Sequence, residues 1–166
     1  MIDWSAVEIN DEHEAALRAY LLEGPEAWLP IQDKLTDAQS AAPYVQLVQA
    51  ALGVALRRRF SPTYDIDQII QFVADVRLSL MESGVTIDPR IAENLVRVSL
   101  GDSDRLEVAP DDVQRLQEAT DATVAMLFFL VAEAQPDEAW LDEFVREAGH
   151  LARRWTAESR FDEATG

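Results

Sequence analysis

Apolar positions recur at intervals of three and four residues along most of the chain, and no stretch alternates with a period of two. Intervals of three and four place side chains on one face of an α-helix, whereas alternation is typical of a strand. The pattern therefore predicts an all-α protein without strands. We expect an irregular orthogonal bundle of about five longer helices with short helical turns, ending in an antiparallel helical hairpin.

Caps, prolines and glycines divide this pattern into separate helices. A first helix is expected from the cap Asn10 to Gly24, and short turns broken by proline should fill 25–42. Longer helices are expected over 43–60, 65–84 and 88–101, the first and last with proline in the first turn. Three consecutive packed helices therefore occupy the middle of the chain.

The helix expected after the cap Asp65 has a strong apolar repeat. Its members are Ile66, Ile69, Ile70, Val73, Val76 and Leu80. Since these residues follow one another at helical spacing, we expect all of them on the buried face.

The remainder of the chain suggests a possible division of the bundle. Residues 102–109 are polar and lack a period, which is typical of a linker, and Pro110 is expected to open the next long helix. A corner at 135–137 leads to the last helix, which we expect to fray beyond Ala157. The sequence predicts a single helical domain over 1–166, with a subdivision into a bundle over 1–101 and a hairpin over 110–157.

Composition limits the class of protein. A chain of 166 residues with 48% hydrophobic content can form one substantial core. It has no cysteine, which excludes disulfides and thiolate metal sites and agrees with a reducing compartment. The longest apolar run, Val124–Ala132, is shorter than the ~20 residues of a membrane span, and we see no signal peptide. A soluble cytoplasmic protein is expected.

The formal charge of -17 is unevenly distributed. Acidic residues outnumber basic residues in 1–43 and in 102–166, whereas 44–101 contains six of each. The net charge disfavours binding to nucleic acid and to anionic membranes. Solubility is the simplest reason for the acidity, and adaptation to salt, a basic partner and mimicry of a nucleic acid are the alternatives.

The basic run Arg57, Arg58 and Arg59 is a candidate site for an anion or for an acidic segment of a partner. The structural alternative is equally good, because cations in the last turn of a helix oppose the negative end of its dipole.

Val124–Ala132 is apolar around the whole circumference of its helix. Such a helix is either a central core helix or one with a face that packs against another subunit or partner. Met126, Phe129 and Leu130 are the candidate interface residues under the second interpretation.

Glu147 and His150 have the Glu-x-x-His spacing that occurs in di-iron helical bundles. The chain lacks the second such pair, so we predict no metal and no cofactor, with these two residues as weak candidates. His13 and Glu143 would be the nearest additional ligands.

No phosphate loop, nucleophile elbow or recognisable catalytic arrangement occurs in the sequence. We therefore expect a non-enzymatic, acidic, helical interaction or regulatory module of the adaptor, chaperone or immunity type. Its expected partner is a protein, a second copy of the chain included, and not nucleic acid or a membrane. The alternative is a helical protein that binds a small ligand or metal, including an enzyme.

Overall fold

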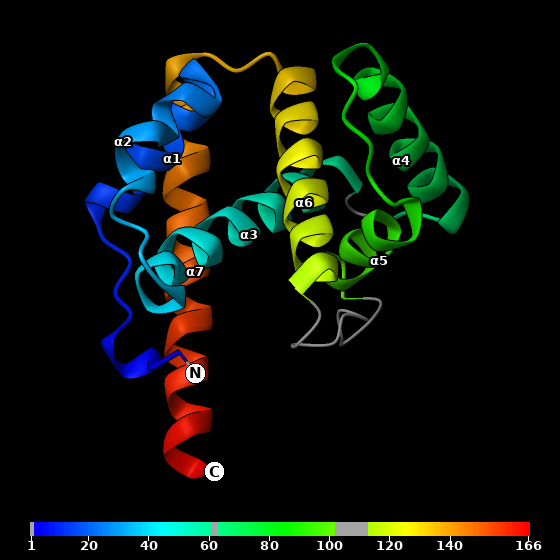
Figure 1. Ribbon diagram of the computed structural model, residues 1–166. Coiled ribbons are helices and arrows are strands. Elements are labelled where there is room, and N and C mark those ends of the chain that lie inside the picture. Colours follow the sequence, from blue (N-terminus) through cyan, green and yellow to red (C-terminus); the bar gives the residue numbers. More distant parts are fainter. Residues whose placement is uncertain (1, 61–62, 102–112) are drawn as a thin grey trace. The chain divides into compact units, whose positions relative to one another are not determined.

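The computed structural model describes residues 2–60, 63–101 and 113–166 (Figure 1). These residues form α-helices and short 3-10 turns and no strand, so the predicted all-α fold class is confirmed. The α-helices are α1 (Asp11–Glu23), α2 (Leu29–Gln32), α3 (Ala38–Phe60), α4 (Ile66–Leu80), α5 (Pro89–Ser99), α6 (Val113–Ala134) and α7 (Glu138–Thr165). The 3-10 turns are η1 (Trp4–Ala6), η2 (Pro25–Trp28) and η3 (Met81–Ser83).

The helices group into two compact units. The first unit comprises Met1–Ala51 and Pro136–Gly166, and the second comprises Leu52–Gln135. Helix α3 contributes to both units, whereas α6 and α7 belong to different ones. The expected hairpin of the last two helices and the single domain therefore stay predictions. The expected linker over 102–109 and the helix start at Pro110 lie outside the described residues.

In the first unit, α1 packs against α7 and η2, and η1 also packs against α7. Asn10 caps α1 as expected, because its Oδ1 accepts hydrogen bonds from the backbone N–H groups of Glu12 and His13. Gly24 ends this helix with φ of 88°, a conformation that glycine adopts without strain. The first predicted helix is thus confirmed with both of its end signals.

Helix α7 holds the N-terminal segment through arginine side chains. Arg153 Nε donates to the carbonyl oxygen of Ile9 at 2.9 Å, and Arg160 Nε donates to that of Trp4 at 2.9 Å. A second nitrogen of Arg160, Nη2, donates to the carbonyl of Val7. The prediction that the chain frays beyond Ala157 is wrong, because α7 continues to Thr165 and Arg160 connects this polar part to the N-terminal segment.

In the second unit, α4 packs against both α5 and α6, and α5 packs against α6. The Phe72 ring makes edge-on contacts with Phe60 and Phe129, at centroid distances of 5.5 and 5.8 Å. Asp65 and Asp88 cap α4 and α5 as expected. Helices α3, α4 and α6 therefore share an aromatic cluster on the inner side of α4.

The start of α3 differs from the prediction. The helix begins at Ala38, and Pro43 lies inside it. Asp37 Oδ1 accepts from the backbone N–H of Ser40 at 2.8 Å, and Ser40 Oγ accepts from the backbone N–H of Asp37. This reciprocal cap starts the helix before the proline.

Candidate functional site

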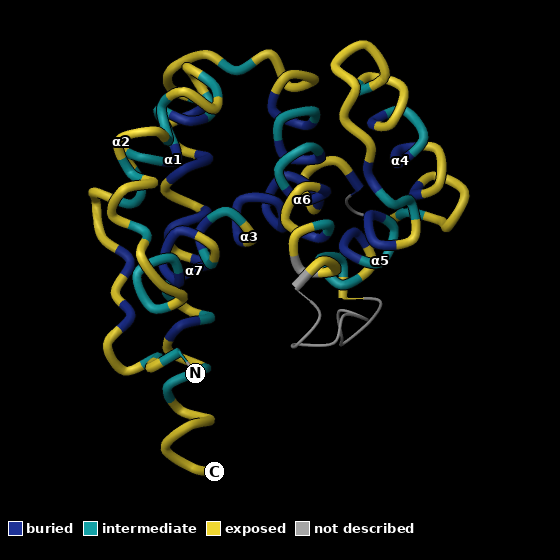
Figure 2. The backbone as a smooth tube through the Cα atoms, viewed as in Figure 1, coloured by how far each residue is buried: buried dark blue, intermediate teal, exposed yellow. Residues whose placement is uncertain are grey.

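Helix α4 and the residues that directly follow it carry the largest concentration of exposed hydrophobic side chains in the described part of the chain. Of nine large hydrophobic residues that are exposed there, five lie within Ile66–Val85. We call the outer apolar row of α4 and Met81 the outer stripe; it consists of the exposed residues Ile66, Ile70, Leu78 and Met81 and the half-buried Ala74. Figure 2 shows α4 buried along one side and exposed along the other.

The spacing of the stripe explains its exposure. A helix turns by about 100° per residue, so the outer stripe and the buried residues Ile69, Phe72 and Val76 lie on different sides of α4. Ile66 and Ile70 are 58% and 47% exposed. The prediction that they belong to the buried face is therefore wrong.

The apolar positions of α4 cover about 240° of its circumference. This arc is wider than the part of the helix surface that packs against α5 and α6.

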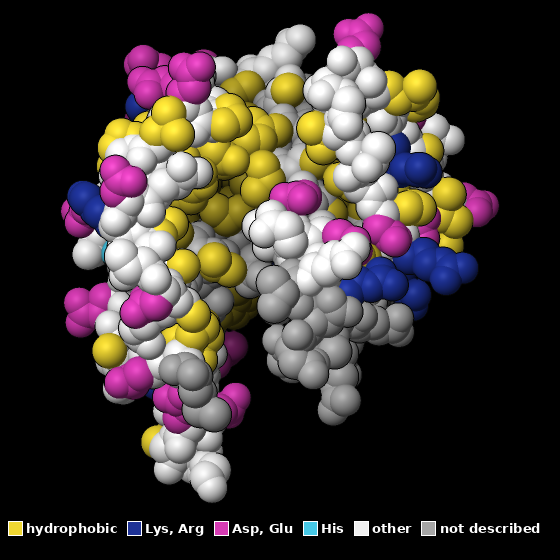
Figure 3. Space-filling model, viewed as in Figure 1, with side chains coloured by type: hydrophobic (Ala, Val, Ile, Leu, Met, Phe, Trp, Pro, Cys, Tyr) yellow, Lys and Arg dark blue, Asp and Glu magenta, His cyan; other side chains and the backbone are white. Residues whose placement is uncertain are grey.

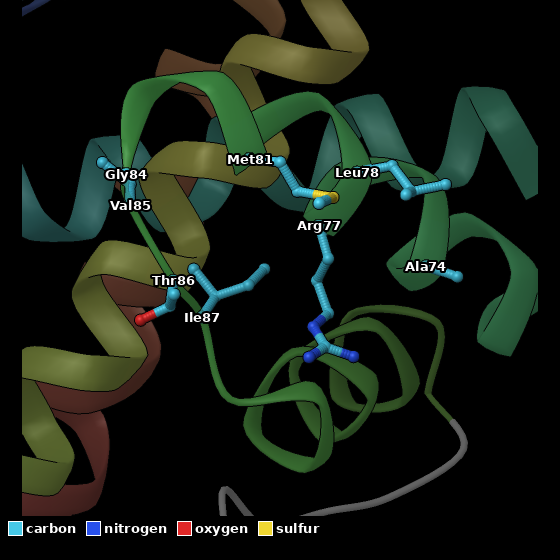
Figure 4. A pocket seen from close by; sticks show the side chains of 8 residues that line it. All are labelled: Ala74, Arg77, Leu78, Met81, Gly84, Val85, Thr86 and Ile87. Atoms are coloured by element: carbon cyan, nitrogen blue, oxygen red, sulfur yellow. The ribbon is translucent and has the colours of Figure 1, made fainter.

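A cavity of about 590 Å³ opens beside the C-terminal half of the outer stripe (Figure 4). Its wall comes from α4, from Met81 and from the segment that leads to α5; the lining residues are Ala74, Arg77, Leu78, Met81, Gly84, Val85, Thr86 and Ile87. In Figure 4, Arg77 extends from α4 toward α5, and Ile87 points toward it from the connecting segment. Leu78 and Met81 are 62% and 70% exposed, so the apolar wall is open to solvent.

A second cavity, of about 230 Å³, lies at the N-terminal half of the same helix. It is lined by Ile66, Ile69 and Ile70 of α4 and by Arg90, Glu93, Asn94 and Arg97 of α5. The outer stripe thus borders one cavity near its beginning and the other near its end.

The charge of these walls is opposite to that of the chain. Among the residues that the structure describes, three arginines, Arg77, Arg90 and Arg97, line the two cavities, against a single carboxylate, that of Glu93. The chain as a whole has 31 acidic and 14 basic residues. Figure 3 shows basic and hydrophobic surface next to each other over this part of the second unit, on the right of the view.

A polar groove of about 220 Å³ lies between α1 and α7 in the first unit. Three of its charged side chains form ion pairs within the protein: Arg18 Nε is 2.6 Å from Asp142 Oδ1, and Glu14 Oε2 is 3.1 Å from Nη2 of the neighbouring Arg153. The other carboxylate oxygen of Glu14 is buried and has no hydrogen-bond partner. A Cβ at Gly149 would overlap this carboxylate, so the missing side chain makes room for it. Because these ion pairs join parts of the first unit to each other, we interpret the groove as a structural contact and not as a binding site.

His13 lies at the edge of an aromatic cluster in the first unit. Its ring meets that of Tyr44 edge-on at 4.7 Å, and Trp28 connects Tyr44 to Tyr20. The Nδ1 atom of His13 accepts the backbone N–H of Asn10 at 3.0 Å and completes the cap of α1. Burial lowers the pKa of His13 and raises the pKa of Tyr44. A neutral imidazole is needed here, since a protonated Nδ1 cannot accept.

The basic run predicted as an anion or partner site lies in the last turn of α3, and all three side chains are exposed. Arg59 Nε is 2.8 Å from Glu133 Oε1, and its guanidinium lies 5.4 Å from the centre of the Phe60 ring. Arg59 is therefore engaged within the protein. Anion or partner binding by Arg57, Arg58 and Arg59 stays a prediction.

The candidate interface residues of α6 lie largely inside the protein. Met126 and Leu130 are buried, and Phe129 is half-buried beside Phe72. This placement agrees with the alternative of a core helix, and their use as an interface stays a prediction.

Glu147 and His150 are both exposed on α7. Among the described residues, no group of three or more histidine, aspartate or glutamate side chains could hold a metal ion. Helices in that part of the chain are also too short or too polar to cross a membrane.

Sequence reasoning missed the outer stripe, although two signals were present. One is the width of the apolar arc of α4, which exceeds the single face that a surface helix buries. The other is the neutral segment 44–101, which contains Arg77, Arg90 and Arg97.

No protein-family model, curated protein or solved structure matches the chain.

Proposed function

We propose that this protein is a non-enzymatic interaction or regulatory module that binds another protein through the outer stripe of α4. The observation that carries the proposal is the grouping of exposed Ile66, Ile70, Leu78 and Met81 beside two cavities. Large exposed apolar patches are typical of protein contacts, since their contact with water is unfavourable in the free protein. An adaptor, chaperone or immunity-type role in the cytoplasm fits such a surface.

The shape of the stripe supports a protein partner. From Ile66 to Met81 it runs along about 22 Å of helix, because each residue adds about 1.5 Å. This length matches about four turns of a helix, and an amphipathic helix in an apolar groove is a common mode of recognition.

Photo-crosslinking in the cells that make the protein tests this proposal. A photoreactive benzoylphenylalanine at Leu78 should give a discrete crosslinked protein. The same residue at Leu22, an exposed leucine of α1, should not. Met81→Glu should abolish the crosslink from position 78, because a charge would be placed in the apolar contact. Absence of a crosslink at position 78, or equal crosslinking at both positions, would contradict the proposal.

A further inference from the structure

We infer that the occupant of this surface is an acidic amphipathic helix of another protein, with its apolar side on the outer stripe and its carboxylates on Arg77, Arg90 and Arg97. The inference rests on the proposed function and specifies the chemistry of the partner. Its basis is the charge of the cavity walls, which is positive on a strongly acidic protein.

The first step concerns the geometry of the arginines. Arg77 lines the larger cavity beside Met81, and Arg90 and Arg97 line the smaller one from α5. Arg90 and Arg97 are seven residues apart, which places them on one face of α5, two turns from each other. Basic side chains therefore accompany the apolar row over much of its length.

The second step concerns the chemistry that these side chains select. A guanidinium binds a carboxylate through paired hydrogen bonds, and all three arginines are exposed enough to reach a ligand. Glutamate or aspartate side chains beside the apolar face of a bound helix would meet this requirement. A basic helix would bring like charges together at these three positions.

The third step concerns a second copy of the chain. A two-fold symmetric contact brings two copies of the same surface together, so the arginines of both copies would lie in one interface. Each copy also carries a formal charge of -17, which opposes association. Charge complementarity therefore favours a different, acidic partner over a symmetric dimer.

Two fluorescent peptides of about four helical turns provide the direct test. Both carry leucine at helical spacing, and they differ only in having glutamate or lysine at the positions that flank the leucines. By fluorescence anisotropy with the full chain, the glutamate peptide should bind at least ~10-fold more tightly than the lysine peptide. Its affinity should fall as salt is raised, because contacts with the arginines are screened.

Variants of the surface locate the binding. Leu78→Glu should reduce the affinity for the glutamate peptide by ~10-fold or more, and Arg77→Glu should reduce it while improving binding of the lysine peptide. Arg154→Glu is the matched control, since Arg154 is an exposed arginine of α7 that lines neither cavity. It should leave the binding of both peptides unchanged.

Several outcomes would overturn the inference. They are equal binding of the two peptides, binding that strengthens with salt, a loss of binding in Arg154→Glu as large as that in Arg77→Glu, and no measurable binding. A wild-type dimer in sedimentation that Leu78→Glu dissociates would also overturn it, by assigning the stripe to a second copy. A discrete crosslink at position 78 together with any of these results would leave the proposed function standing, with only the partner chemistry wrong.

Discussion

Arginine side chains have contrasting environments in the two units. In the first, Arg153 and Arg160 of α7 donate to backbone carbonyls of the N-terminal segment. In the second, Arg77 and Arg90 line open cavities beside exposed hydrophobic side chains. The same residue type therefore joins distant parts of the chain in one unit and borders an open surface in the other.

The two faces of α4 repeat this contrast within one helix. Phe72 on the inner face is 2% exposed and contacts two aromatic rings, whereas Leu78 on the outer face is mostly exposed. Hydrophobic character alone does not distinguish these positions. Substitutions can, because only a buried side chain leaves a cavity when it is shortened.

The largest expected effect is that of Phe72→Ala. It should lower the free energy of unfolding by about 4 kcal/mol, as buried phenylalanines do when they are truncated. Leu78→Ala on the outer face is the matched control and should change stability by less than ~0.5 kcal/mol. Urea denaturation followed by circular dichroism measures both values. A cost above ~1.5 kcal/mol for Leu78→Ala would show that the outer stripe is structural.

Arg160→Ala should give the next largest effect. It removes two charge-assisted hydrogen bonds to backbone carbonyls, so we expect a loss of about 2 kcal/mol in denaturant unfolding. Cleavage of the N-terminal segment by protease should also become faster. Arg154→Ala, at an exposed position of the same helix, should change neither measurement. Equal unfolding free energies and equal cleavage rates in the two variants would contradict an anchoring role for Arg160.

A smaller effect is expected where Glu14 lies against Gly149. Alanine is favoured over glycine inside a helix by about 1 kcal/mol, but a Cβ at position 149 would displace the carboxylate of Glu14. Gly149→Ala should therefore fail to stabilise the wild-type chain and should add about 1 kcal/mol in a Glu14→Ala background. A double-mutant cycle measures this coupling, and additive effects would refute it.

The smallest expected effect is the contribution of His13 to the pH dependence of the free energy of unfolding. Burial lowers its pKa, opposed by Glu12 and reinforced by Arg153. The folded protein therefore favours the neutral ring. Its contribution to stability is complete above the unfolded pKa of about 6.5 and is lost as pH falls toward the lower folded value.

His13→Gln is the informative variant, because glutamine can still accept the N–H of Asn10 but does not titrate. Chemical denaturation at several pH values should show a difference in the free energy of unfolding between wild type and variant that is constant above pH ~7. Below pH ~6.5, the wild type should lose stability relative to the variant. A difference that stays constant through this range would show that His13 does not titrate differently in the folded state.

Local signals predicted the helices well where their ends depend on nearby residues. Asn10, Asp65 and Asp88 cap helices as expected, since each side chain reaches backbone groups two or three residues away. The extent of α7 could not be predicted in this way. Its polar end is held by hydrogen bonds from Arg160 to residues more than 150 positions earlier in the chain.

The candidate site was the least predictable feature. Arg57, Arg58 and Arg59 stood out because they are consecutive, whereas Arg77, Arg90 and Arg97 are separated in sequence and line the surface only after α4 and α5 pack. Ile66 and Ile70 were expected inside because periodicity identifies apolar residues on one side of a helix without identifying what covers them.

The amino-acid sequence by itself determined the helical class, most helix boundaries and the absence of cysteine chemistry, because helical periodicity, caps and composition are local properties. Only the tertiary structure decided which side of α4 is buried and which arginines border its exposed side. Those choices depend on the packing of α5 and α6, since burial is set by neighbours in space.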